Sequence, residues 1–178
     1  MKNRHQKKRS NTVKQKAMIE SLIFQTNWGI KRNYSPDDSI LAMTKAELDC
    51  IIELNLVEDL LLIKKFVDDV KSAFSIEPVA GRGDFCNSLA ALALGIGRTN
   101  IITELNAPAD WQGLAEKKIL GIYYTNDFRN TIVDYAKKNG YNVSTYLGKP
   151  IIKLSKVFLL LERVRQEHKL SQKCYNLC

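Results

Sequence analysis

The chain has 178 residues, a length typical of one globular domain, and 45% of them are hydrophobic. No apolar run reaches the roughly 18 residues of a membrane span, and the basic start has no apolar core of signal-peptide type. These features exclude a membrane-spanning protein and predict a cytoplasmic one without a membrane partner. The four cysteines lack Cys-x-x-Cys spacing, so no zinc site is expected.

The net charge of +8 is concentrated at the N-terminus. Seven basic residues precede the first acid, Glu20, and they are Lys2, Arg4, Lys7, Lys8, Arg9, Lys14 and Lys16. The other 20 of the 27 basic residues nearly cancel the 19 acids. Residues 1–16 are therefore expected to form a flexible basic arm. Such an arm attracts nucleic acid phosphates through counterion release, and the alternative is a solubilising tail.

A helical pattern starts at Val13 and is expected to end at Gly29, acting as a C-terminal cap. Trp28 and Tyr34 could stack on a base beside the two cations of Lys31-Arg32. Packing is the more common role for such aromatics, and the sequence favours it.

Two further helices are expected before residue 75. Thr44-Lys45-Ala46-Glu47 has the pattern of a capping box, which predicts a helix start at Lys45. A second helix is expected over residues 57–74. It carries the adjacent pair Asp68 and Asp69, which resembles a metal-binding pair. Neighbouring helical residues diverge by about 100°, so this pair is expected on a solvated face.

Residues 78–89 are the stretch in which chemistry is expected. An extended approach enters the tight turn Gly81-Arg82-Gly83, and an apolar helix follows Ser88. The free N–H groups of a helix's first turn can hold an anion, and an arginine fork suits phosphate. The turn therefore predicts a phosphate or nucleotide site built from Gly81, Arg82, Gly83 and Ser88. The alternative is a Gly-x-Gly turn that only ends a strand.

The second half predicts a short-stranded sheet. A buried strand is expected over residues 118–124, a helix over 127–139 with Asn126 as its N-cap, a strand over 141–147 and a last helix over 152–168. Tyr123 and Tyr124 could cover a base, although no spacing requires it. The resulting fold class is α+β, a small, mostly helical domain with a sheet covered by helices on one side.

The order of these motifs over residues 44–164 resembles the palm region of the bacterial replicative DNA polymerase III α subunit, a C-family polymerase. The first half matches a helix pair, an apolar-Pro-Val approach, Gly-Arg-Gly, Ser88-Leu89-Ala90-Ala91 and Leu94-Gly95-Ile96. The match resumes at Asp127 and Arg129 and continues to Gly140-Tyr141. The resemblance implies a polymerase-β-like nucleotidyltransferase palm over residues 17–170, followed by a frayed tail over 171–178.

The departures from this family concern catalysis. Asp84 stands where the family's Gly-Arg-Gly-Ser has its serine, and Asn87-Ser88 replaces the following Gly-Ser. The strand that carries the family's Asp-x-Asp aligns with residues 119–124, which contain no carboxylate. Because two-metal nucleotidyl transfer needs acidic oxygens, no catalytic or metal-binding residue is expected. Magnesium would accompany only a bound nucleotide.

Three functions follow as hypotheses. The first is a catalytically inactive palm-like protein that binds nucleic acid through the arm and a nucleotide through the turn, in DNA replication or on a phage or mobile element. The second is a structural or interaction protein that uses the domain as a scaffold for a protein partner. The third is a nucleotidyltransferase with relocated carboxylates, for which Asp84, Asp110 and Asp127 are the available acids.

Overall fold

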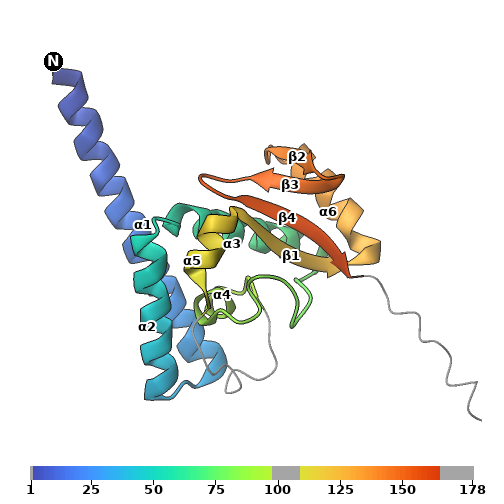
Figure 1. Cartoon of the computed structure of the whole chain (residues 1–178), viewed down its shortest axis with the longest axis horizontal. Coiled ribbons are helices and arrows are strands. Elements are labelled where there is room, and N and C mark those ends of the chain that lie inside the picture. The colour runs from blue at the N-terminus through green and yellow to red at the C-terminus, as the bar shows by residue number, and fades with distance from the viewer. Residues whose placement is uncertain (1, 98–108, 165–178) are drawn as a thin grey trace, which may run out of the picture.

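The structure is a computed structural model that describes residues 2–97 and 109–164, with side chains from Thr12 onward. The fold is α+β, as expected from the sequence. The helices are α1 (Lys2–Tyr34), α2 (Asp38–Glu53), α3 (Val57–Phe74), α4 (Leu89–Ala93), α5 (Trp111–Lys117) and α6 (Asn126–Lys138), and the strands are β1 (Ile119–Thr125), β2 (Val143–Tyr146), β3 (Lys149–Lys153) and β4 (Phe158–Val164) (Figure 1). In the described part of the chain, no helix combines the length and the apolar character needed to cross a membrane.

The strands form one mixed sheet in the order β1-β4-β3-β2. β1 and β4 pair in parallel, with Tyr123 opposite Glu162, and the other pairs are antiparallel. The last helix expected from the sequence, over residues 152–168, is therefore wrong, since Ile152 lies in β3 and residues 158–164 form β4. A continuous apolar run such as 157–161 suits a central strand and a buried helix equally, so periodicity alone could not separate them.

One face of the sheet forms the main core. Leu120, Ile122 and Tyr124 of β1 alternate towards this face, together with Leu159 and Leu161 of β4, and all five are at most 2% exposed. They belong to one cluster with the buried sides of α3 and α6, which lie behind the sheet in Figure 1. Burial raises the pKa of the Tyr124 hydroxyl. Tyr124 is thus a core residue and does not cover a base.

The bounds of α1 and α2 differ most from the sequence prediction, and Asn126, the expected N-cap of α6, is its first residue, with Thr125 at the cap. α1 continues through Gly29, where an added Cβ would lie 1.9 Å from the carbonyl oxygen of Ala93. The glycine therefore allows close packing of α1 against α4 and does not end the helix. α2 begins seven residues before Lys45, because the Asp37 carboxylate accepts a hydrogen bond from the Ile40 amide at 2.8 Å. Thr44-Lys45-Ala46-Glu47 is consequently inside the helix and is not a capping box.

Asp68 and Asp69 diverge, as the helical geometry predicts. Asp68 pairs with Lys64 on the exposed side of α3. Asp69 instead accepts hydrogen bonds from Lys65 Nζ at 2.6 Å and from the Tyr141 hydroxyl at 2.5 Å. The hydrogen bond from Lys65, and then that from Tyr141, lowers the pKa of Asp69. This contact attaches α3 to the residues that lead into β2.

Gly29→Ala tests the packing of α1 on α4. Alanine normally stabilises a helix interior by about 1 kcal/mol over glycine, but here its methyl group meets a backbone carbonyl. We expect the free energy of unfolding to fall by about 2 kcal/mol or more, measured by urea denaturation. Asn33→Ala, at an exposed position of the same helix, should change it by at most about 0.5 kcal/mol. A stabilised Gly29→Ala variant would contradict the packing.

Asp69→Asn should destabilise the protein in a pH-dependent way. The folded-state pKa is lowered, so the stabilisation is present above the unfolded pKa, near about 4, and is lost as the pH falls through the folded-state value. We expect a loss of about 1 kcal/mol at pH 7 that shrinks towards pH 3, measured by urea denaturation. Asp68→Asn, which removes only a helical i,i+4 pair, should cost about 0.5 kcal/mol or less. Equal pH profiles for the two variants would show that Tyr141 adds nothing.

Candidate functional site

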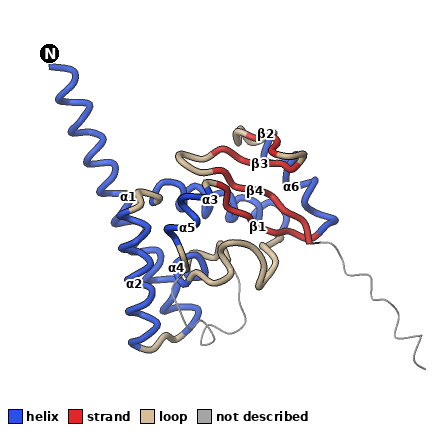
Figure 2. The backbone as a smooth tube through the Cα atoms, in the orientation of Figure 1, coloured by secondary structure: helices blue, strands red, loops and turns tan. Residues whose placement is uncertain are grey.

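The Gly-Arg-Gly turn lies against β1. The loop between α3 and α4 is drawn as a long tan segment beside this strand (Figure 2). Three hydrogen bonds join the two: Val79 N to Tyr123 O at 2.8 Å, Asp84 N to Gly121 O at 3.1 Å, and Gly121 N to Asp84 Oδ2 at 2.6 Å. The turn is thus held by the edge of the sheet on both sides of the two glycines.

Gly83 is required by this contact with β1. Its φ of +90° is in the region that favours glycine, and an added Cβ would lie 2.6 Å from the carbonyl oxygen of Gly121. The sequence predicts that the turn approaches something closely, and in the structure that neighbour is the backbone of β1. Gly81, which also has a positive φ, has open space around it, and the side chain of Arg82 is exposed. These two residues of the predicted phosphate site are accessible.

The amides at the start of α4 are occupied by Glu47 of α2. This residue is 1% exposed, and its carboxylate accepts hydrogen bonds from the Ser88 hydroxyl at 2.7 Å and from the Leu89 and Ala90 amides, both at 3.1 Å. The Ala109 amide, at 3.2 Å, and the indole N–H of Trp111, at 3.5 Å, donate to the same carboxylate.

The anion that the sequence predicts at this helix start is therefore present as a side chain of the protein itself. Ser88 is fully buried and caps α4 by accepting from the Ala91 amide at 3.0 Å. Phosphate binding by Ser88 stays a prediction, and in this conformation Glu47 holds the position. One sign in the sequence indicates that Glu47 is buried, since it stands directly before the apolar Leu48. The same residue also fits a capping box, which is the interpretation that the sequence pattern favours.

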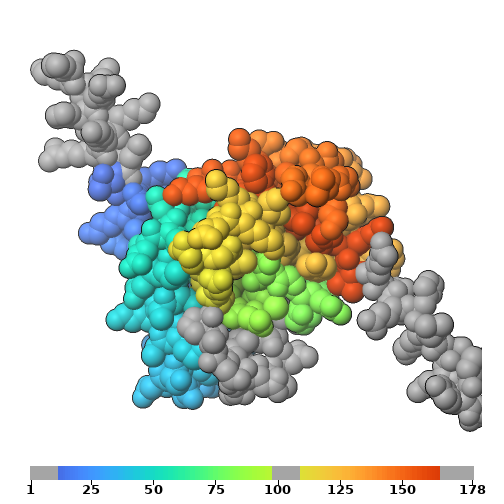
Figure 3. All heavy atoms as spheres, viewed as in Figure 1, coloured from blue at the N-terminus to red at the C-terminus, as the bar shows by residue number. Residues whose placement is uncertain are grey.

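A cavity of about 360 Å³ lies on the other face of the sheet, next to Gly83. Tyr123 and the paired Glu162 line it, together with Asp84. Both carboxylates are matched by lysines, since Lys117 Nζ lies 3.2 Å from Asp84 Oδ1 and Lys149 pairs with Glu162. The space-filling view shows α5 in yellow, the turn region in green and β4 in red on this side of the molecule (Figure 3). With its charges paired, the cavity offers no free cation to a phosphate among the described residues that line it.

The three acids of the relocated-carboxylate hypothesis have separate local roles. Asp84 bonds to Gly121 and Lys117. Asp110 caps α5 by accepting from the Gly113 amide at 2.9 Å, and Asp127 is exposed in the first turn of α6. Among the described side chains, those of residues 12–97 and 109–164, no three His, Cys, Asp or Glu come together as a metal site would require.

The positive charge of the protein resides on α1. Nine lysines and arginines and a single acid, Glu20, lie between Lys2 and Tyr34, whereas the rest of the sequence contains 18 basic and 18 acidic residues. The helix runs through Lys2, Arg4, Lys7, Lys8 and Arg9, whose side chains lie outside the described part, and it projects away from the body (Figure 1). The basic arm of residues 1–16 (the basic segment) is helical from Lys2 onward, and its flexibility stays a prediction.

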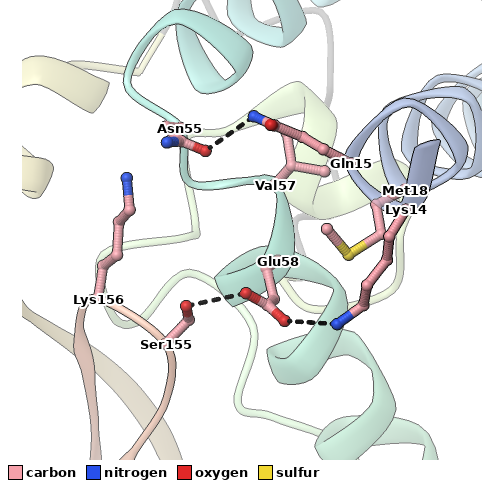
Figure 4. A pocket seen from close by; sticks show the side chains of 8 residues that line it. All are labelled: Lys14, Gln15, Met18, Asn55, Val57, Glu58, Ser155 and Lys156. Carbon is pink, nitrogen blue, oxygen red and sulfur yellow. Dashed lines mark hydrogen bonds and ion pairs between the residues drawn. The ribbon is translucent and has the colours of Figure 1, made fainter. Parts of the chain in front are cut away.

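A second cavity, of about 320 Å³, marks the place where the basic segment joins the body (Figure 4). Lys14 Nζ lies 3.5 Å from Glu58 Oε1, and Gln15 Nε2 donates to Asn55 Oδ1 at 3.4 Å. Ser155, from the turn before β4, donates to the other oxygen of Glu58 at 2.9 Å. Lys14 is therefore partly an anchor of α1. Lys16 Nζ lies 3.8 Å from Glu20 Oε1 on the same helix.

Exposed aromatic side chains follow the basic segment along α1. Trp28 is 60% exposed, whereas Tyr34 packs against a small cluster that includes Ile30 and Ile40. The sequence favoured packing for both, which holds for Tyr34 and is wrong for Trp28. Phe24, which sequence reasoning did not single out, is 69% exposed. Its position four residues before Trp28 is the signal that could have shown it.

A scan against protein-family models finds no matching family, and a search of curated proteins finds no matching relative. The resemblance to the polymerase palm therefore stays a prediction that rests on the motifs themselves.

Glu47→Gln tests the central role of the buried carboxylate. The amide nitrogen would face N–H and O–H donors, so at least two of the five hydrogen bonds that the described residues donate lose their acceptor. We expect the free energy of unfolding to fall by about 3 kcal/mol, measured by urea denaturation and followed through the fluorescence of the buried Trp111. Glu53→Gln, an exposed change in the last turn of α2, should cost no more than about 0.5 kcal/mol. Equal stability of the two variants would contradict this role.

Proposed function

We propose that the protein is a nucleic-acid-binding protein in which a palm-like body, without nucleotidyl-transfer activity, holds a basic helix for contact with phosphates. The observation that supports this most strongly is the charge distribution: α1 accounts for the whole net charge of +8, and the rest of the sequence is neutral. A helix with nine cations and one acid has a strong attraction for a polyanion.

The anchoring of α1 supports the same proposal. Contacts of Lys14 and Gln15 with the start of α3 fix the helix at the body, and the buried side of α1 includes Leu22 and Ile30, both fully buried. The part of α1 from Lys14 onward is therefore held against the body, and the basic residues before Lys14 extend from it. A role in DNA replication or on a phage or mobile element is the context that the palm resemblance implies.

The body supports a binding role better than a catalytic one. The acids near the turn are used in local contacts, and Glu47 fills the helix start where a phosphate would bind. Arg82 and Gly81 stay accessible beside the cavity at Gly83, so a nucleotide with magnesium is included as a separate ligand in the test. The alternative, a scaffold for a protein partner, predicts that the basic residues do not affect affinity for nucleic acid.

The proposal predicts that affinity for nucleic acid depends on the position of the basic residues and not on net charge alone. Replacing Lys2, Arg4, Lys7, Lys8 and Arg9 by glutamine leaves the anchor Lys14 in place. We expect affinity for a fluorescent oligonucleotide at about 50 mM salt to fall by about tenfold or more. For duplex DNA, the slope of the logarithm of the affinity against the logarithm of the salt concentration should become shallower. The change should be up to about 0.9 for each phosphate that is no longer neutralised. Fluorescence anisotropy at about 50 and 200 mM salt measures both quantities.

The matched control replaces five exposed lysines outside α1 by glutamine: Lys45, Lys118, Lys137, Lys138 and Lys153. Both variants carry the same net charge, so the affinity of the control should fall threefold or less. Equal decreases in the two variants, or no binding by the unmodified protein, would contradict the proposal. Nucleotide with magnesium is then compared with magnesium alone on the unmodified protein, and a change in affinity that needs the nucleotide would show that a nucleotide is a second ligand.

A further inference from the structure

α1 has an exposed apolar face that the body does not cover. Val13 and Phe24 are each 69% exposed, and Trp28 is 60% exposed. At 3.6 residues per turn, positions 13 and 24 lie about three turns apart on one side of the helix, and position 28 is about one turn further on. Gly29 and the fully buried Leu22 and Ile30 lie on the opposite side, against α4 and the core. The aromatic pair thus faces solvent although the helix is packed behind it.

Cations lie beside this aromatic pair at its C-terminal end. Lys31 and Arg32 follow Trp28 by three and four residues, which places them beside it on the helix surface. Both are exposed, and neither has an ion pair with any described side chain of residues 12–97 and 109–164. At the other end, Glu20 lies one turn before Phe24 and pairs with Lys16, and the basic residues of α1 continue beyond this pair. An exposed aromatic pair beside unpaired positive charges is a combination that single-stranded nucleic acids bind, with bases on the rings and phosphates on the cations.

We propose that the face of α1 carrying Phe24 and Trp28 binds single-stranded nucleic acid by stacking of its bases. This inference rests on the proposed function and adds the form of the nucleic acid and the residues that select it. In a duplex the base faces are covered by their neighbours, whereas a single strand can turn them towards aromatic side chains. The two rings are four residues apart, about 6 Å along the helix axis, so neighbouring bases can reach both.

Charge disfavours a second copy of the chain as the occupant of this face. Two α1 helices packed face to face would bring together two segments with nine basic residues and one acid each. Like charges placed against each other oppose association. A nucleic acid carries the opposite charge, so its approach to this face of α1 is favoured.

Phe24→Leu/Trp28→Leu tests the inference. Leucine keeps the helix propensity and much of the apolar surface, and both positions are exposed, so circular dichroism and urea stability should stay unchanged. We expect affinity for an oligothymidylate of about 20 nucleotides to fall at least about fivefold, and affinity for a duplex of equal length to change less than twofold. The matched control is Phe128→Leu/Tyr146→Leu, which removes two aromatics that are 44% and 47% exposed on α6 and β2.

Tryptophan fluorescence gives an independent measurement. The sequence has two tryptophans, and Trp111 is 1% exposed. Quenching on addition of oligothymidylate should therefore come from Trp28 and should disappear in Trp28→Leu.

The outcomes separate this inference from the proposed function. If the aromatic variant binds the single strand as tightly as the unmodified protein, while the variant without the five basic residues binds weakly, only the stacking inference is overturned. If affinity for duplex and for single strand falls equally, the face acts without selecting base faces, and the inference is also overturned. A dimer of the unmodified protein that the aromatic variant converts to a monomer, measured by sedimentation, would overturn it by assigning the face to a second copy.

Discussion

The buried carboxylate of Glu47 is the interaction on which the arrangement of this protein depends. It accepts hydrogen bonds from the start of α4, from Ala109 and from the indole of Trp111, so one side chain of α2 joins segments up to 64 residues away. A carboxylate is costly to bury unless donors surround it, and here every named contact is a donor. The α4 amides therefore need no external anion to be satisfied.

The contact of the Gly-Arg-Gly turn with β1 is the second constraint. Gly83 has the backbone conformation and the absent Cβ that allow Asp84 to reach Gly121. A glycine-rich turn before a helix is often associated with phosphate, because backbone N–H groups are then accessible. In this protein the same features are satisfied by the backbone of β1 and by Glu47. A motif of this kind thus predicts a close approach more securely than it predicts what is approached.

The parts of the fold predicted correctly are those with local signals. β1 and α6 follow from an apolar run and a strongly amphipathic segment that Gly140 ends, and their observed bounds differ from the prediction by one residue or so. β4 was missed because its apolar run fits either period. The role of Glu47 was missed because its donors are distant in sequence, and that of Gly29 because only tertiary packing distinguishes it from a cap.

These assignments leave the solvent-facing side of α1 with charges and aromatic rings that the described part of the body does not use. The polar groups of the turn region are largely paired within the body, and the charges outside α1 balance. The helix instead combines unbalanced cations with exposed aromatics, two features that lower solubility or stability when they serve no contact. Because Gly29 and Leu22 fix the opposite side of α1 to the body, the aromatic side has a set orientation before any partner binds. A partner therefore meets a preformed surface, and the ordering cost of binding is confined to the partner and to the surface side chains.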